Sequence, residues 1–198
     1  MAAVPVVVFS DFTCPFSYVT EAALWRLEDE GRAAPAYAAF ELFPVPTPLP
    51  AETDGAEWPE ALRDLAREAG VELRTPGPPA RTRKAHEAAR FAAERGVGRE
   101  MRAAVYAACF RDGRDVGRID VLVELAAGLG LDESEAKAVL DVDGFTAAVE
   151  RDEALARRAG VEATPALVVG AGPGAQMLLG AHGIDALREA LDRAEAGG

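Results

Sequence analysis

Strand-like segments occur only near the two ends of this chain, and a long helix-rich block lies between them. Residues 4–9 form a nearly continuous β-branched run, as expected of a strand buried on both faces. A helix is predicted over 15–30, where apolar residues recur at helical spacing, and a second strand over 36–42. The N-terminal part therefore has the order strand, helix, strand.

The central block carries helical patterns separated by glycine stops. Helices are predicted over 58–70, 81–95, 99–111, 118–129 and 134–140, with 71–79 as a linker rich in proline and glycine. No strand signal interrupts this block. We expect residues 51–143 to form a helical insertion domain, and residues 1–50 and 144–198 to form the second domain.

The C-terminal part returns to an α/β pattern. A helix is predicted over 144–159, a strand over 166–169, a return strand over 176–179 after a glycine-rich turn, and a final helix over 184–194. The whole order is βαβ, helical insertion, αββα. This order predicts an α/β fold whose sheet is divided in sequence by the insertion.

The charge of the chain narrows the choice of partners. It has 33 acidic and 21 basic side chains among 198 residues, a formal net charge of −12. This balance disfavours nucleic acid or an anionic membrane as a partner. No apolar run approaches a membrane span, and residues 1–9 lack the basic leader of a secretory signal. We expect a cytoplasmic protein; a homodimer is an assembly that the sequence allows.

Cys14 is the residue that most clearly suggests chemistry. It lies between the first strand and the first helix, and Pro15 follows it at a position where the missing N–H is not needed. Unpaired backbone N–H groups and the helix dipole favour a thiolate there. A buried inert cysteine is the alternative. Ser17 stands where a dithiol enzyme has its second cysteine, and its hydroxyl is expected to donate to the sulfur.

The second cysteine, Cys109, lies in a helix rich in small apolar residues, and we expect it to pack in the core. A bridge to Cys14 is the less favoured alternative because a disulfide has strict geometry. No group of His, Asp, Glu and Cys has metal-ligand spacing, so no metal site is predicted.

Four segments of the chain, in order, resemble the DsbA-like branch of the thioredoxin superfamily. They are Asp11-Phe12-Thr13-Cys14-Pro15-Phe16-Ser17-Tyr18, the segment 81–89, the segment 107–116, and Gly160-Val161-Glu162-Ala163-Thr164-Pro165 with the strand after it. Because they span most of the chain, the resemblance implies a thioredoxin-like fold in which a helical insertion separates the N-terminal βαβ and C-terminal ββα units.

The resemblance also implies a set of site residues. Pro165 corresponds to the cis-proline whose loop faces the reactive sulfur, and Thr164 would flank that sulfur. Pro15 and Phe16 would shape the rim of the substrate site. His86 could line the cleft over Cys14, although a solvated or capping histidine is the commoner outcome.

Within that branch the chain looks closest to the FrnE-like group, which is related to kappa-class glutathione transferases and 2-hydroxychromene-2-carboxylate isomerases. FrnE-like proteins have a cysteine at the position of Ser17, whereas the other two groups have serine at the position of Cys14. Arg81 stands where relatives commonly have asparagine. This chain therefore has the first cysteine of the FrnE-like group, at Cys14, but lacks the second, at Ser17.

The leading hypothesis is therefore a thiol-disulfide oxidoreductase with a single active-site cysteine, in which Cys14 attacks, Ser17 stabilises the thiolate and Pro165 positions a protein, peptide or small-thiol disulfide. No cofactor is predicted, but glutathione or another small thiol would act as co-substrate, because Ser17 cannot resolve a mixed disulfide. Two alternatives remain: a glutathione-dependent transferase or isomerase, and a redox-inactive binding module.

Overall fold

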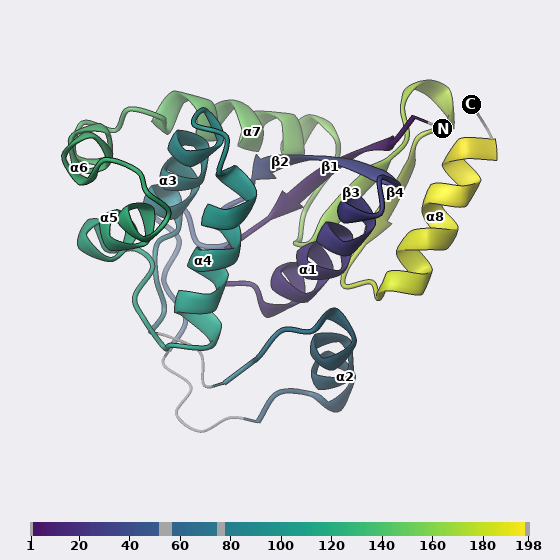
Figure 1. The fold of residues 1–198 in the computed structure, drawn as a ribbon, viewed down its shortest axis with the longest axis horizontal. Coiled ribbons are helices and arrows are strands. Elements are labelled where there is room, and N and C mark those ends of the chain that lie inside the picture. The colour runs from purple at the N-terminus through teal and green to yellow at the C-terminus, as the bar shows by residue number, and fades with distance from the viewer. Residues whose placement is uncertain (1, 52–56, 75–77, 197–198) are drawn as a thin grey trace.

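A four-stranded sheet forms the centre of the molecule in the computed structural model, which describes residues 2–51, 57–74 and 78–196 (Figure 1). The strand order is β2-β1-β3-β4. β1 (Val4–Ser10) pairs in parallel with β2 (Ala33–Ala39) and antiparallel with β3 (Ala166–Val169), which pairs antiparallel with β4 (Gln176–Leu179). The predicted α/β class with a thioredoxin-like arrangement is confirmed.

The sheet is covered by helices on both faces (Figure 1). α1 (Pro15–Asp29) and α8 (Ile184–Ala196) pack against the face that carries Val6 and Val8. α7 (Thr146–Arg158) packs against the opposite face through Ala156, next to Phe9. β1 therefore buries side chains on both faces, which explains its continuous apolar run.

The second strand begins at residue 33, earlier than the predicted start at 36. Pro35 lies inside it, and proline usually argues against a strand because it cannot donate to the ladder. β2 is an edge strand in the order β2-β1-β3-β4, where a missing donor is tolerated. Its placement follows from pairing with β1, with Val4 opposite Ala33, and not from its own residues.

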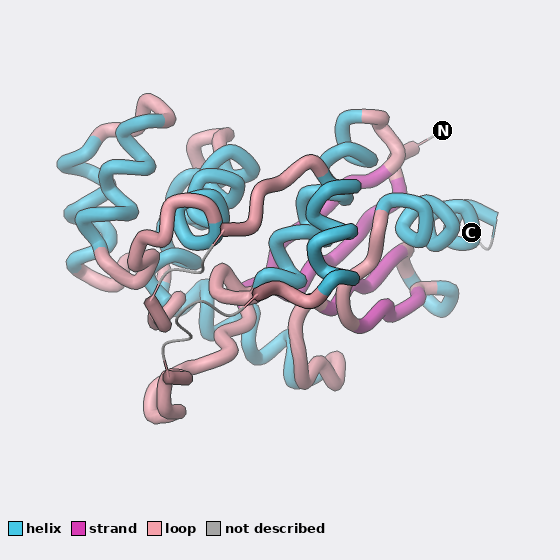
Figure 2. The backbone as a smooth tube through the Cα atoms, turned by 90° about the horizontal axis from the view of Figure 1, so that it is seen from below, coloured by secondary structure: helices cyan, strands magenta, loops and turns pink. Residues whose placement is uncertain are grey.

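The central block is helical, as predicted. Its helices are α2 (Glu60–Ala69), α3 (Arg83–Ala93), α4 (Gly98–Phe110), α5 (Ile119–Gly128) and α6 (Glu133–Asp141). α3 to α6 gather on one side of the sheet, whereas α2 lies apart from them (Figures 1 and 2). Leu62 of α2 packs against Val19 of α1. Residues 75–77 of the predicted linker and the last two residues of the chain lie outside the described residues.

The core between α1 and α4 is aromatic. Tyr18 of α1 stacks on Tyr106 and Phe110 of α4, with ring centroids 5.0 and 6.0 Å apart. Cys109 is 3% exposed in the same cluster, so the prediction of core packing is confirmed. It is not joined to Cys14 by a disulfide. Within the described residues, no helix is long and apolar enough to cross a membrane.

Candidate active site

Cys14 is the residue that caps the N-terminus of α1. Its backbone is extended, with φ −95° and ψ 110°, and its N–H donates to the carbonyl of Asp11 at 3.1 Å. The helix begins at Pro15, as predicted. The side chain of Cys14 makes no capping hydrogen bond and is 5% exposed. The sulfur therefore lies at the positive end of the helix, where negative charge is favoured.

The loop before β3 brings Pro165 and Thr164 to this sulfur. The Thr164–Pro165 peptide bond is cis. Cys14 Sγ donates to the carbonyl oxygen of Thr164 at 3.5 Å, across 150 positions of sequence. The hydroxyl of Thr164 is buried and has no hydrogen-bond partner among the described residues. Three of the predicted site residues thus meet in space.

Ser17 and Phe16, the two residues after Pro15, differ in exposure to solvent. Ser17 is fully buried, and its hydroxyl accepts a hydrogen bond from the Asp11 N–H at 3.5 Å. The expected donation from Ser17 to the sulfur is not among the hydrogen bonds of the described residues; the hydroxyl contacts the Asp11 N–H instead. Phe16 is 40% exposed and lies at the surface, and Pro15 is half-buried.

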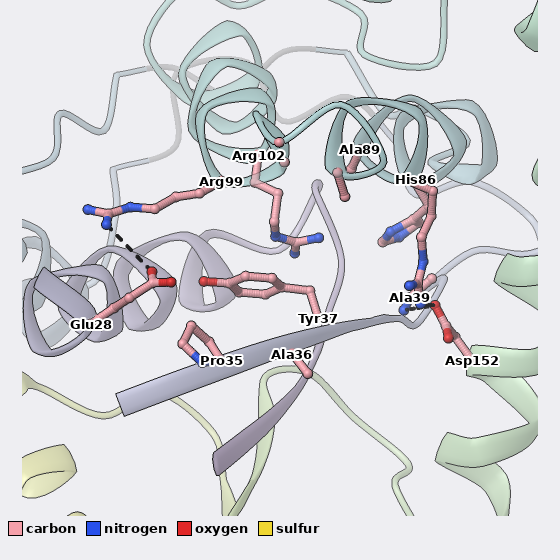
Figure 3. A pocket seen from close by; sticks show the side chains of 14 residues that line it. Glu28, Pro35, Ala36, Tyr37, Ala39, His86, Ala89, Arg99, Arg102 and Asp152 are labelled. Carbon is pink, nitrogen blue, oxygen red and sulfur yellow. Dashed lines mark hydrogen bonds and ion pairs between the residues drawn. The ribbon is translucent and has the colours of Figure 1, made fainter. Parts of the chain in front are cut away.

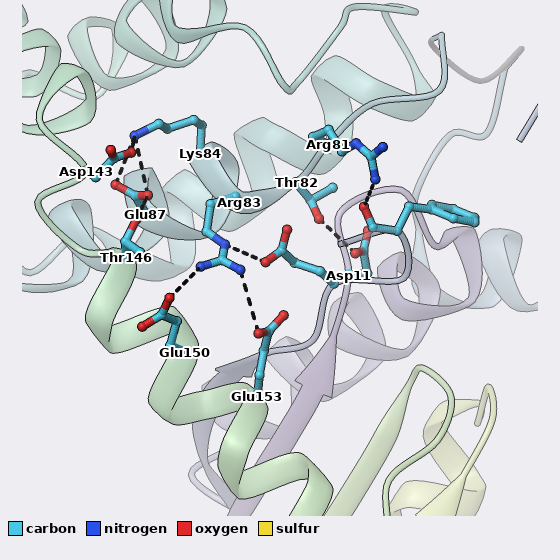
Figure 4. A network of polar contacts seen from close by, with 12 residues as sticks. Asp11, Arg81, Thr82, Arg83, Lys84, Glu87, Asp143, Thr146, Glu150 and Glu153 are labelled. Carbon is cyan, nitrogen blue, oxygen red and sulfur yellow. Dashed lines mark hydrogen bonds and ion pairs between the residues drawn. The ribbon is translucent and has the colours of Figure 1, made fainter. Parts of the chain in front are cut away.

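Asp11 organises the loop that carries Cys14, although the sequence did not suggest this role. Its Oδ1 accepts hydrogen bonds from the N–H and the hydroxyl of Thr13, and its Oδ2 accepts from the N–H of Leu42 and the hydroxyl of Thr82 (Figure 4). Burial raises the pKa of this carboxyl, while these four donors oppose the rise. The Asp-x-Thr spacing predicts the two hydrogen bonds from Thr13 to Asp11. No sequence pattern near Asp11 predicts the hydrogen bonds from Leu42 and Thr82.

A charged network beside this loop joins α3 to α7 and to the segment after β2 (Figure 4). Arg83 of α3 donates to the buried carboxylate of Glu41 at 2.5 Å. It also lies 3.7 Å from Glu153 and 3.8 Å from Glu150, both on α7. Burial raises the pKa of Glu41 to about 7, although Arg83 opposes the rise and Glu153 adds to it. Glu41 thus titrates near neutral pH.

This raised pKa predicts a pH-dependent stability. An unfolded glutamate titrates near 4.3. Between about pH 4.3 and 7 the folded protein binds more protons at Glu41 than the unfolded chain, so the free energy of unfolding falls as the pH rises through this window. We expect the stability of the wild type relative to Glu41→Gln to decline from pH 5 to pH 8. Urea unfolding at four pH values measures this difference.

Glu150→Gln is the matched control for that experiment. Its side chain is 63% exposed and faces the same guanidinium group of Arg83. We expect little pH dependence in its difference from the wild type. If the stability of the wild type relative to Glu41→Gln instead rises with pH, the Arg83 ion pair outweighs burial and the prediction is wrong.

A second, fully buried network joins α1 to α4. Glu21 accepts two hydrogen bonds from Arg102, at 2.6 and 2.5 Å, and one from the hydroxyl of Tyr106 at 2.7 Å. Arg102 also donates to the hydroxyl of Ser10 at the end of β1. Glu21 is one turn beyond Ser17 on α1, so this network anchors the helix that presents Cys14.

His86 is a buried residue of α3. It is 2% exposed, so a solvated histidine is wrong. Its ring lies against Phe12 with centroids 4.9 Å apart. It lines a cavity between β2, α3 and α4 whose lining includes neither Cys14 nor Pro165. A substrate contact at His86 stays a prediction. Among the described residues, no three His, Cys, Asp or Glu side chains are arranged to hold a metal ion.

Comparisons with known proteins agree with this geometry. The family model described as "DSBA-like thioredoxin domain" matches residues 5–192. The protein YwbO of Bacillus subtilis is 31% identical over 193 residues, which cover 93% of this chain and 94% of YwbO. Among solved structures, a probable DsbA oxidoreductase from Streptomyces coelicolor has a TM-score of 0.80 and 25% identity, covering 98% of this chain and 91% of its own.

Two further solved structures share the fold at lower identity. The cytosolic disulfide reductase DsbM of Pseudomonas aeruginosa has a TM-score of 0.73 and 21% identity, covering 98% of this chain and all of its own; another structure of it contains glutathione. A 2-hydroxychromene-2-carboxylate isomerase has a TM-score of 0.73 and 18% identity, covering 98% of this chain and 95% of its own.

Proposed function

This chain belongs to the DSBA-like thioredoxin domain family, and from that premise we propose that it is a thiol-disulfide oxidoreductase with one reactive cysteine, Cys14. The observation that carries the proposal is the meeting of Cys14 with the Pro165 loop. The sulfur is at the N-terminus of α1 and 3.5 Å from the carbonyl oxygen of Thr164. A substrate disulfide that binds at this loop would therefore come within reach of the sulfur.

The chemistry requires three exchange steps. The Cys14 thiolate attacks one sulfur of a substrate disulfide, whose S–S bond breaks, and the other substrate sulfur leaves as a thiolate. Ser17 cannot attack the resulting mixed disulfide, and Cys109 lies buried in the core. The thiolate of an outside thiol therefore attacks the substrate sulfur of the mixed disulfide, the bond to Cys14 breaks, and Cys14 is released as a thiolate. The outside thiol and the substrate sulfur are then joined in a new disulfide. A second molecule of the outside thiol attacks that disulfide, which frees the substrate as a thiol and leaves the two outside thiols joined as their own disulfide.

Glutathione is the co-substrate that we propose, in a cytoplasmic setting. The support comes from the fold neighbour DsbM, which is described as a cytosolic disulfide reductase and has a structure with glutathione. A small thiol also suits a site with one cysteine, because such a site must receive its second sulfur from solution. We also propose that the chain belongs to the FrnE-like group of this family.

Intact-protein mass spectrometry after incubation with oxidised glutathione tests this function. We expect one glutathione adduct on the wild type and on Cys109→Ser, and none on Cys14→Ser. An unreactive Cys14 in the folded protein would contradict the mechanism, and an internal bridge between Cys14 and Cys109 would contradict the role given to Cys109.

The isomerase neighbour favours a second candidate, a glutathione-dependent transferase or isomerase. Such an enzyme would activate the sulfur of bound glutathione without oxidising Cys14. Calorimetry with reduced glutathione separates the two candidates: binding that survives Cys14→Ser, with no disulfide exchange in the wild type, favours the transferase. If reduced glutathione does not bind and the wild type shows no disulfide exchange, the redox-inactive binding module is the candidate that remains.

A further inference from the structure

A cavity of about 370 Å³ lies between the edge strand β2, α3 and α4, away from Cys14. Figure 3 shows its shape: Tyr37 of β2 lies below, Arg102 of α4 lies above, and Glu28 and His86 stand at opposite ends. The guanidinium group of Arg102 lies between these ends, 4.3 Å from the centre of the Tyr37 ring. Half of the residues that line the cavity are charged or polar, among them Arg90, Arg99 and Arg102, and the other half are alanine, glycine or proline.

Two buried polar atoms of residues that line this cavity have no hydrogen-bond partner. Among the described residues only three buried side-chain nitrogen or oxygen atoms lack one, and two of the three, Glu28 Oε2 and His86 Nε2, belong to residues that line this cavity. His86 is 2% exposed, and its ring points into the cavity (Figure 3). A buried polar group without a partner is costly, so native proteins rarely leave one empty.

The two ends of the cavity differ in what they can receive. At one end, burial of the imidazole is the main reason that the pKa of His86 lies well below its usual range. The positive charges of Arg102, Arg83 and Arg90 lower this pKa further. The imidazole is therefore neutral and offers an N–H, in a positive field that favours an anion. Asp152 pairs with Arg90 at this end and partly reduces that field.

The other end can receive a cation or a donor. Glu28 Oε2 lies 3.5 Å from Arg99 Nη1, an ion pair without a hydrogen bond. Arg99 is already held by two hydrogen bonds to Asp29, at 2.5 and 2.8 Å. The carboxylate of Glu28 can therefore bind a ligand while Arg99 keeps its hydrogen bonds to Asp29.

From this arrangement we propose that the cavity binds a small ω-amino carboxylate, with the carboxylate at His86 and Arg102 and the ammonium group at Glu28. The ligand must be extended, because the two unpartnered atoms stand at opposite ends of the cavity (Figure 3). It would satisfy both atoms at once and leave the ion pairs of Arg90 and Arg102 in place. This site is independent of the function proposed for Cys14.

Titration of ¹⁵N-labelled protein with glycine, γ-aminobutyrate and ε-aminocaproate tests the proposal. We expect γ-aminobutyrate or ε-aminocaproate to give saturable chemical-shift changes at residues that line the cavity, including Tyr37 and His86. Glycine should give none, because its charged groups are too close together to reach both ends. Butyrate, which lacks the ammonium group, should bind at least about tenfold more weakly than γ-aminobutyrate, equivalent to about 1.4 kcal/mol.

A matched pair of variants locates the ammonium group. Glu28→Gln should weaken binding about tenfold, whereas Glu30→Gln, which lies on the same end of the first helix but pairs with Arg188, should leave it unchanged. Alkylation of Cys14 should not affect binding. The proposal is overturned if none of the three compounds binds, if the shifts gather around Cys14, or if both glutamine variants bind like the wild type.

Discussion

Replacement of Cys14 by serine is expected to abolish thiol-disulfide exchange, lowering its rate on the order of a thousandfold or more. A serine hydroxyl has almost the size of the thiol but does not form an anion near neutral pH, so it cannot attack a disulfide. The position at the start of α1 favours negative charge on sulfur and cannot compensate for this difference. The measurement is steady-state reduction of a small disulfide with glutathione as reductant.

Cys109→Ser is the control for this experiment. Cys109 is buried in the aromatic core, so its replacement should lower stability and leave the exchange rate of the folded protein nearly unchanged. An exchange rate in Cys14→Ser within tenfold of the wild type would contradict the monothiol mechanism. If that variant also keeps a glutathione transfer reaction, the transferase candidate takes its place.

The sequence revealed the parts of this molecule that depend on local patterns. The Cys14–Pro15 helix start needs only the strand before it and the helical spacing after it. Strands β3 and β4 were predicted at their observed bounds because a turn and apolar residues define them. The contact between Cys14 and Thr164 spans 150 positions and was accessible only through the resemblance to a family.

The parts that the sequence did not reveal depend on long-range packing. Asp11 receives Leu42 and Thr82 from segments whose positions only the fold determines. His86 lies among charged residues in sequence, which suggested a solvated side chain, yet α3 turns it toward Phe12 and the cavity. β2 shows the same principle, since pairing with β1 sets its start at residue 33 despite Pro35.

Loss of the arginine in the buried Glu21–Arg102 pair is expected to give the largest loss of stability. Arg102→Ala should lower the free energy of unfolding by about 3–5 kcal/mol, because it leaves the carboxylate of Glu21 buried without its main partner. Tyr106 alone would still donate to it. Urea unfolding at neutral pH measures the loss. The control is Arg99→Ala, whose pair with Asp29 is exposed and should contribute about 1 kcal/mol or less.

A double variant shows whether the pair acts as a unit. If the loss arises from an uncompensated buried charge, removing Glu21 together with Arg102 should cost less than the sum of the two single losses, since no buried charge then remains. Additive losses would instead mean that each side chain contributes separately through packing. Because Glu21 lies one turn beyond Ser17, the single variants should also slow the reaction of Cys14 in the folded protein. A stable variant with unchanged Cys14 reactivity would show that α1 keeps its position without this pair.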